Sequence, residues 1–285
     1  MVHAPALRLR RRFEIRPLAA LIEGAARAGY LARGVVHASV GVIALLAALG
    51  LTPRAEGVLG ALDAWRQWPA GLALLWLTGF GLYAFAGWRA LQAVLDVDRK
   101  GHAPKALLSR LGQAISGATY AAMAVSLFGL LDAIEDLGEA DDQARTRAFV
   151  TETLQLPMGD LLVIAAGLFV AGCGVGSTVR AAVDHFGRDL DCDRRTQRWL
   201  GALARAGYLG RGVALIPAGV FLLLAGWRAH AGEARGLGGA LDALGRQPFG
   251  DAILGLTALG LVAFGLFAVA EGWLRPMRPE RALDA

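Results

Sequence analysis

The chain has 285 residues, of which 55% are hydrophobic, and its mean hydropathy of +0.47 excludes an ordinary soluble domain. A net charge of +5 and a pI of about 9.7 suit a nucleic-acid-binding protein as well as a membrane protein. Because the basic residues cluster beside apolar runs, we expect a membrane protein with no nucleic-acid partner.

The N-terminal segment, residues 1–17, is basic. Its stretch RRRFEIRP resembles a twin-arginine export signal, but no apolar core follows until about Gly34, and five more apolar runs come later. We therefore interpret residues 1–17 as a basic arm in the cytoplasm.

Six apolar segments follow along the chain, and each is long enough to cross a bilayer core of roughly 30 Å as a helix. A soluble helix of this length would carry a polar stripe, and these segments have none. The sequence therefore predicts an all-α polytopic membrane bundle of six transmembrane helices, with spans at about 34–51, 70–93, 112–133, 158–180, 207–227 and 250–273.

The distribution of basic residues predicts the topology. If the N-terminus is cytoplasmic, 22 of the 29 Lys and Arg residues flank the spans on that side, as the positive-inside rule requires. We expect a multi-pass protein of the bacterial plasma (inner) membrane, with a cytoplasmic tail at residues 279–285 and anionic lipid headgroups as partners.

Two phrases recur along the chain and define an internal repeat. ARAGYLARGVVH at 26–37 returns as ARAGYLGRGVAL at 204–215, and a weaker copy, SRLGQAISGATY, occupies 109–120. A proline before each second span, at Pro69, Pro157 and Pro248, extends the alignment. Each copy holds two spans, so the copies enter the membrane in the same orientation, as three parallel two-helix repeats around a pseudo-threefold axis. The repeats cover residues 18–100, 101–190 and 191–278.

Small residues recur seven positions apart in the spans, which places them on one helical face. Such residues let membrane helices approach closely, so we interpret them as helix-packing positions. The glycines concerned are Gly34, Gly41, Gly79, Gly167, Gly174, Gly212, Gly219 and Gly265.

The stretches WRALQAVLDVDRKG and SRLGQAISGATYAAMA resemble the family called domain of unknown function 1206, and so does ARGLGGALDALGRQPFGDAILGLTALGLVAFGLFAVAEGWLR. The resemblance extends from about Ala26 to Arg275 and implies a bacterial membrane protein of three two-helix repeats. The family has no established activity, so it implies no catalytic or binding residues. The middle copy departs from the pattern, because Ser116 replaces the second arginine of the phrase.

Charged and aromatic residues stand at the cytoplasmic ends of the first and fifth spans. Arginine is costly in hydrocarbon and usually extends to the headgroups, and tyrosine is enriched at the interface. We therefore expect six interfacial anchors, Arg27, Tyr30, Arg33, Arg205, Tyr208 and Arg211. The alternative is an inward-facing anion site around the repeat axis, although Ser116 interrupts the ring. Arg180 and Glu271, at equivalent repeat positions, suggest an ion pair at the cytoplasmic rim.

Signatures of catalysis and of cofactors are missing from the sequence. His37 and His185 lie at similar depth, which allows a haem or metal site, but Tyr120 and Leu215 stand at the repeat positions of His37 and no third ligand is evident. No Walker loop, HExxH motif or GxSxG motif occurs. We expect no enzyme, no cofactor and no metal.

Two functions remain compatible with the sequence. We expect a non-catalytic membrane scaffold or accessory subunit, which binds anionic lipid and a membrane protein partner, because no span has an evident charged residue at mid-depth. The alternative is a carrier or channel for a small solute or ion, with its pathway along the repeat axis. A polar cavity on the axis would favour the carrier.

Overall fold

A computed structural model describes residues 4–98, 101, 103–133, 142–186 and 190–277 of the chain. These residues form helices and connecting segments, and none of them lies in a β-strand. The expected tail at 279–285 lies outside the described residues.

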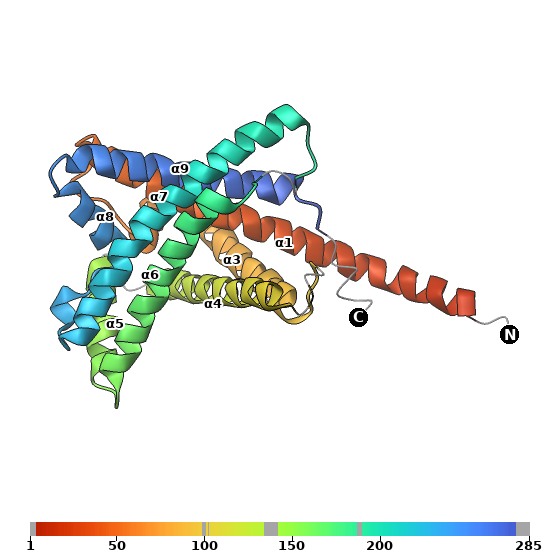
Figure 1. Ribbon diagram of the computed structural model, residues 1–285, viewed down its shortest axis with the longest axis horizontal. Coiled ribbons are helices and arrows are strands. Elements are labelled where there is room, and N and C mark those ends of the chain that lie inside the picture. Colours follow the sequence, from red (N-terminus) through yellow and green to blue (C-terminus); the bar gives the residue numbers. More distant parts are fainter. Residues whose placement is uncertain (1–3, 99–100, 102, 134–141, 187–189, 278–285) are drawn as a thin grey trace.

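Six long helices make up the body of the molecule (Figure 1). Each is long and apolar enough to span a membrane, so the protein is an all-α, multi-pass membrane protein. The helices are α1 (Ala4–Ala48), α3 (Gly71–Val94), α4 (Pro104–Ala133), α6 (Gly159–Val183), α7 (Arg194–Trp227) and α9 (Gly250–Leu274). Residues 4–17 continue α1 in helical conformation, and Pro17 lies within that helix.

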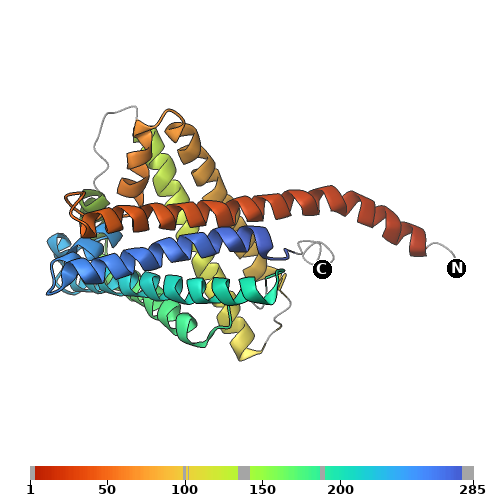
Figure 2. The ribbon, with the colours of Figure 1, turned by 90° about the horizontal axis from the view of Figure 1, so that it is seen from above.

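Short helices join the two long helices within each repeat. The connections contain α2 (Val58–Asp63) with the 3-10 helix η1 (Ala64–Gln67), then α5 (Asp142–Leu154), and then η3 (Ala231–Glu233) with α8 (Leu237–Gly245). They gather at one end of the bundle, whereas α1 begins and α9 ends at the opposite end (Figures 1 and 2).

The six long helices form an incomplete ring. Helix α1 packs between α3 and α9, helix α7 packs between α9 and α6, and α3 packs on α4. Figure 2 shows α1 and α9 running side by side. In the described part of the chain, α4 and α6 have no comparable contact with each other, although they are the two helices of the middle repeat. The ring is therefore open at this one place.

Glycines form the contacts between successive repeats. A Cβ atom added to Gly265 of α9 would lie 2.5 Å from the carbonyl oxygen of Gly34 on α1, and one added to Gly174 of α6 would lie 2.9 Å from the backbone nitrogen of Ile216 on α7. Each of the eight glycines expected to pack lies this close to a neighbouring helix. Backbones can approach closely there because no side chain intervenes.

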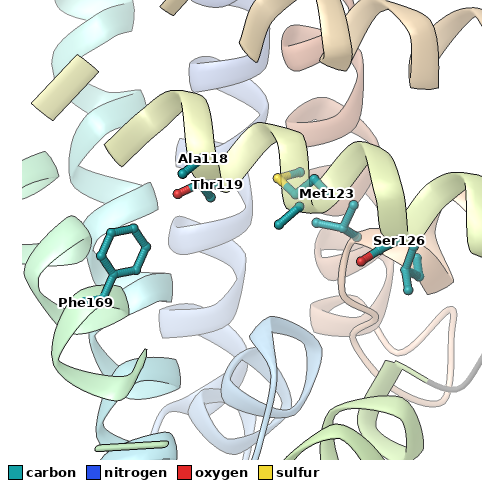
Figure 3. A pocket seen from close by; sticks show the side chains of 8 residues that line it. Ala118, Thr119, Met123, Ser126 and Phe169 are labelled. Atoms are coloured by element: carbon teal, nitrogen blue, oxygen red, sulfur yellow. The ribbon is translucent and has the colours of Figure 1, made fainter. Parts of the chain in front are cut away.

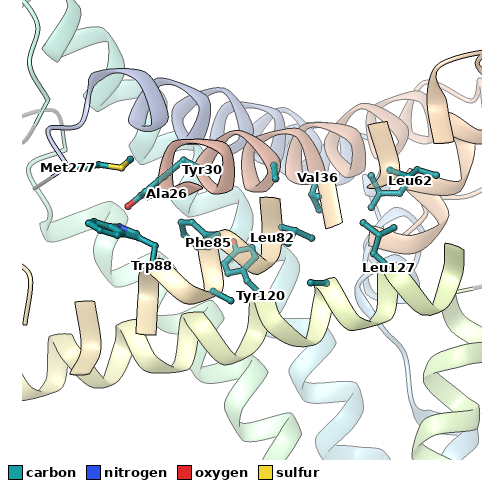
Figure 4. Packing of buried hydrophobic residues seen from close by; sticks show 14 of the residues in the cluster. Ala26, Tyr30, Val36, Leu62, Leu82, Phe85, Trp88, Tyr120, Leu127 and Met277 are labelled. Atoms are coloured by element: carbon teal, nitrogen blue, oxygen red, sulfur yellow. The ribbon is translucent and has the colours of Figure 1, made fainter. Parts of the chain in front are cut away.

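Aromatic side chains fill the interior on the side of α1, α3 and α4. Tyr30 meets Phe85 edge to face at a centroid distance of 4.9 Å, and Phe85 meets Tyr120 in the same way at 4.8 Å. Figure 4 shows these rings between the three helices, with Trp88 beside them. These buried side chains fill the interior of this half of the helix ring, and the open half holds the candidate site.

Candidate binding cavity

A cavity of about 1510 Å³ occupies the open side of the ring. Residues of α3 and α4 line one side of it, and residues of α6, α7 and α9 line the other. It reaches from the interior to the end of the bundle where α6 ends and α7 begins, because Asp184, His185 and Asp191 also line it. Arg33, Ser116 and Arg211, at equivalent positions of the three repeats, all face this one cavity. The repeat axis therefore passes through it.

Arg33 lies inside the bundle and is only 2% exposed. Its guanidinium carbon is 4.5 Å from the ring centroid of Phe264 and 5.3 Å from that of Phe85, with Tyr30 and Tyr120 at 6.0 Å. Rings at this distance attract a cation through their quadrupoles, and this attraction offsets part of the cost of burying the charge.

Glu271 is the carboxylate that balances this charge. It accepts a hydrogen bond of 3.5 Å from Arg33 Nη1 and one of 3.2 Å from Arg275 Nη1. Arg275 also donates to the hydroxyl of Tyr30. A buried charge is tolerated when it is paired, so Glu271 links the start of the first repeat to the end of the third.

Arg211 extends into the same cavity without a carboxylate partner among the described residues. Its guanidinium carbon lies 5.1 Å from the centroid of Phe264, the ring that also faces Arg33. The two positive charges are thus within about 10 Å of each other, close enough to repel through a low-dielectric interior. Glu271 pairs with Arg33 and Arg275 but forms no ion pair with Arg211, which leaves the inner part of the cavity positively charged.

The cavity also gathers polar atoms that lack partners. Within the described part of the chain, five buried side-chain atoms make no hydrogen bond, and all five belong to residues that line this cavity. They are Arg33 Nε, Trp88 Nε1, Arg89 Nε, Gln113 Oε1 and the hydroxyl of Tyr120. Buried polar groups are normally satisfied, and four of these five can donate. The cavity is therefore suited to an occupant that accepts hydrogen bonds.

Four of the six expected interfacial anchors are wrong. Tyr30 is fully buried, Arg33 is 2% exposed and Tyr208 is 3% exposed, so none of them reaches the headgroups. These three residues face the inside of the helix bundle. There the aromatic ring of Tyr30 lies against the guanidinium group of Arg33, that of Tyr208 lies against Arg180, and Glu271 neutralises Arg33. Arg211 likewise faces the cavity, which agrees with the inward-facing alternative.

The remaining two anchors stay predictions. Arg27 pairs with Glu23 and donates to the carbonyl oxygens of Gly272 and Trp273, where α9 ends. Arg205 is exposed on α7, about one and two-thirds turns before Arg211.

The expected ion pair between Arg180 and Glu271 is also wrong. Arg180 instead pairs at 2.8 Å with Asp184, the residue that follows α6, and packs over the ring of Tyr208. Glu271 is already shared by Arg33 and Arg275. Both residues nevertheless line the same cavity, as their shared repeat position implies.

The two histidines have different environments. His37 lies against Phe264 and Tyr120, and its Nδ1 is 2.9 Å from the carbonyl oxygen of Arg33. His185 lines the mouth of the cavity. No group of three potential metal ligands occurs in the part of the chain that the structure describes.

Sequence reasoning did not single out Trp88, Arg89 or Gln113 as cavity residues. One signal for Gln113 was present, because it occupies the repeat position of Tyr30 and Tyr208. Trp88 and Arg89 have no such signal, since the equivalent residues of the other repeats differ in chemistry.

An apolar groove of about 430 Å³ continues from the cavity toward the end of the bundle that holds the short helices. Thr119 and Phe169 line both hollows. Figure 3 shows Ala118, Met123 and Ser126 of α4 on one side of the groove and Phe169 of α6 on the other. The opening between α4 and α6 is thus polar in one half and apolar in the other.

Comparison with known proteins agrees with the repeats. The family model Domain of Unknown Function (DUF1206) matches three times, at residues 28–96, 111–184 and 206–275. An uncharacterised protein of Bacillus subtilis (strain 168), YxxB, is 28% identical over 258 residues, which cover 90% of this chain and 92% of the relative. No solved structure matches the chain. The family description indicates no catalytic activity.

Proposed function

Because the chain belongs to the DUF1206 family and builds one cavity from its three repeats, we propose that it is a membrane carrier whose substrate bears an anionic group. The observation that supports this most strongly is the convergence of unpaired donors. Every buried polar side-chain atom without a partner in the described residues lies on the lining of the axial cavity.

The charge of the cavity favours an anion over a cation or a neutral solute. Arg33 and Arg211 lie against the same ring, that of Phe264, and Glu271 pairs with Arg33 but not with Arg211. An anion between the two guanidinium groups would therefore relieve their repulsion. Arginine also presents its donors in a fork that matches carboxylate and phosphate oxygens. We place the anionic group between Arg211, Arg33 and the hydroxyl of Tyr120.

The cavity also bears on the scaffold function expected from the sequence. That expectation depended on the absence of a charged residue inside a span. Arg33 is such a residue, and ionisable groups inside membrane proteins usually mark the pathway of a substrate or ion. A scaffold has no need of an unneutralised cavity, whereas a carrier requires a site at the interface of its repeats.

Binding of inorganic phosphate to the purified protein, measured by calorimetry in detergent, tests this proposal. We expect Arg211→Ala to weaken phosphate binding at least tenfold, since a hydrogen bond to a charged group contributes about 1.5–3 kcal/mol. Arg205→Ala removes the same charge from an exposed position of the same helix and should leave binding unchanged. Absence of phosphate binding, or equal losses in both variants, would contradict the carrier and favour the scaffold.

A further inference from the structure

The opening between α4 and α6 has a cause in the sequence of the middle repeat. In the first repeat, Gly29 lies against the backbone of Phe85, where an added Cβ would be 2.6 Å away. In the third repeat, Gly207 meets Phe264 at the same distance. A Cβ added to the equivalent glycine of the middle repeat, Gly112, would meet no atom of another segment within 4 Å.

Bulky residues replace small ones where the two helices of a repeat should meet. Gly81 of the first repeat faces Ala32, and Gly260 of the third faces Gly210. The middle repeat has Phe169 and Ile115 at these positions. A contact too close for one added Cβ cannot accommodate a phenyl ring, so α4 and α6 stay apart.

Small residues in the same repeat enlarge the hollow behind this opening. Cys173 stands at the position of Phe85 and Phe264, and Gly176 stands at the position of Trp88 and Phe267. Both small residues line the cavity. The middle repeat therefore holds its helices apart at one level and removes the side chains that would fill the gap at another.

The opening faces the bilayer. Leu111 on α4 and Leu168 on α6, which flank it, are 55% and 60% exposed, and Val179 is 51% exposed. Apolar side chains exposed on a membrane helix contact lipid, so a molecule in the bilayer can reach the cavity between α4 and α6 without passing through water.

We infer that the substrate is an anionic amphiphile that enters sideways from the membrane, an inference that rests on the proposed carrier function. The positively charged cavity would hold its anionic headgroup at Arg211, Arg33 and Tyr120. The apolar groove beside Ala118, Met123 and Phe169 would hold its acyl chain. Thr119 and Phe169 line both hollows, so one molecule can occupy the two at once.

Two native cysteines allow a direct test on the full chain. Cys173 lines the cavity, and Cys192 lies between α6 and α7 outside its lining. We expect phosphatidic acid in mixed micelles to slow maleimide labelling of Cys173 at least tenfold and to leave Cys192 unchanged. Phosphatidylcholine, which has no net charge, should protect neither cysteine. Equal protection by both lipids, or none by phosphatidic acid, would overturn the inference.

A substitution in the groove separates the amphiphile from a soluble anion. Ala118→Trp fills the groove from an exposed position, and Val175→Trp adds the same ring to an exposed position of α6 outside both hollows. Ala118→Trp should abolish protection by phosphatidic acid while phosphate binding persists, and Val175→Trp should change neither. If phosphate binds but phosphatidic acid does not protect Cys173, the proposed carrier function is supported and the proposed amphiphilic substrate is wrong. If neither binds, both proposals fail.

Discussion

Glu271 is a residue whose position in the chain gives little indication of its role. It stands near the end of the last span, yet it accepts hydrogen bonds from Arg33 of the first helix and from Arg275. Both guanidinium groups lie in a polar cavity inside an apolar bundle, where an unpaired charge is costly. One carboxylate therefore stabilises the contact of the first and third repeats and also sets the charge of the cavity.

Glu271→Gln should lower stability and tighten anion binding at the same time. Removing one partner of a buried pair costs about 3–5 kcal/mol, and we expect the low end because the cavity admits water. Arg33 is then free to bind an anion, so phosphate affinity should rise severalfold. Denaturant unfolding and calorimetry measure the two effects.

Glu233→Gln, which breaks the exposed pair with Arg228, should cost less than about 1 kcal/mol. Equal destabilisation in both variants would contradict the role given to Glu271.

At the level of helices, two kinds of small-residue contact hold the ring together. Contacts between successive repeats involve Gly34 with Gly265 and Gly174 with Gly212, and they occur at every junction. Contacts within a repeat involve Gly29 and Gly207 but are missing at Gly112. The first kind was predictable, because it recurs in all three copies at a spacing of seven. The second kind is interrupted in the middle copy, so only the structure shows what its interruption does.

Alanine substitutions should rank the glycines by what lies opposite each one. Gly265→Ala places a methyl group against the backbone of α1, which cannot yield, so it should cost about 1–3 kcal/mol. Gly79→Ala meets the ring of Phe128, which can rotate, so it should cost less. Gly87→Ala meets no atom within 4 Å and should be neutral or stabilise α3 by up to about 1 kcal/mol. Thermal melting in detergent checks this order, and a Gly87→Ala variant as unstable as Gly265→Ala would refute it.

For the whole molecule, composition and repetition predicted six membrane-spanning helices and the threefold plan, because membrane helices need length and apolarity that the sequence displays directly. The site was harder to predict. An arginine near the end of a span usually extends to the headgroups, and only tertiary contacts show that Arg33 turns inward toward Glu271. Whether Arg33 points to the headgroups or to the interior depends on which face of α1 packs against α9. No local sequence pattern around Arg33 specifies that face.

The topology of the whole molecule is the last prediction. Helix α1 begins and α9 ends at the same end of the bundle, the end at which the cavity has its mouth. Most Lys and Arg residues flank the spans at this end, so we predict that it is cytoplasmic and that the cavity opens inward.

Cys192 lies at this end and exposed Arg228 at the other. In a Cys173→Ala background, a membrane-impermeant maleimide should label Cys192 only in inverted vesicles. A cysteine introduced by Arg228→Cys, with Cys192 replaced by alanine, should be labelled in intact cells. Labelling of Cys192 in intact cells would reverse the orientation and turn the mouth of the cavity outward.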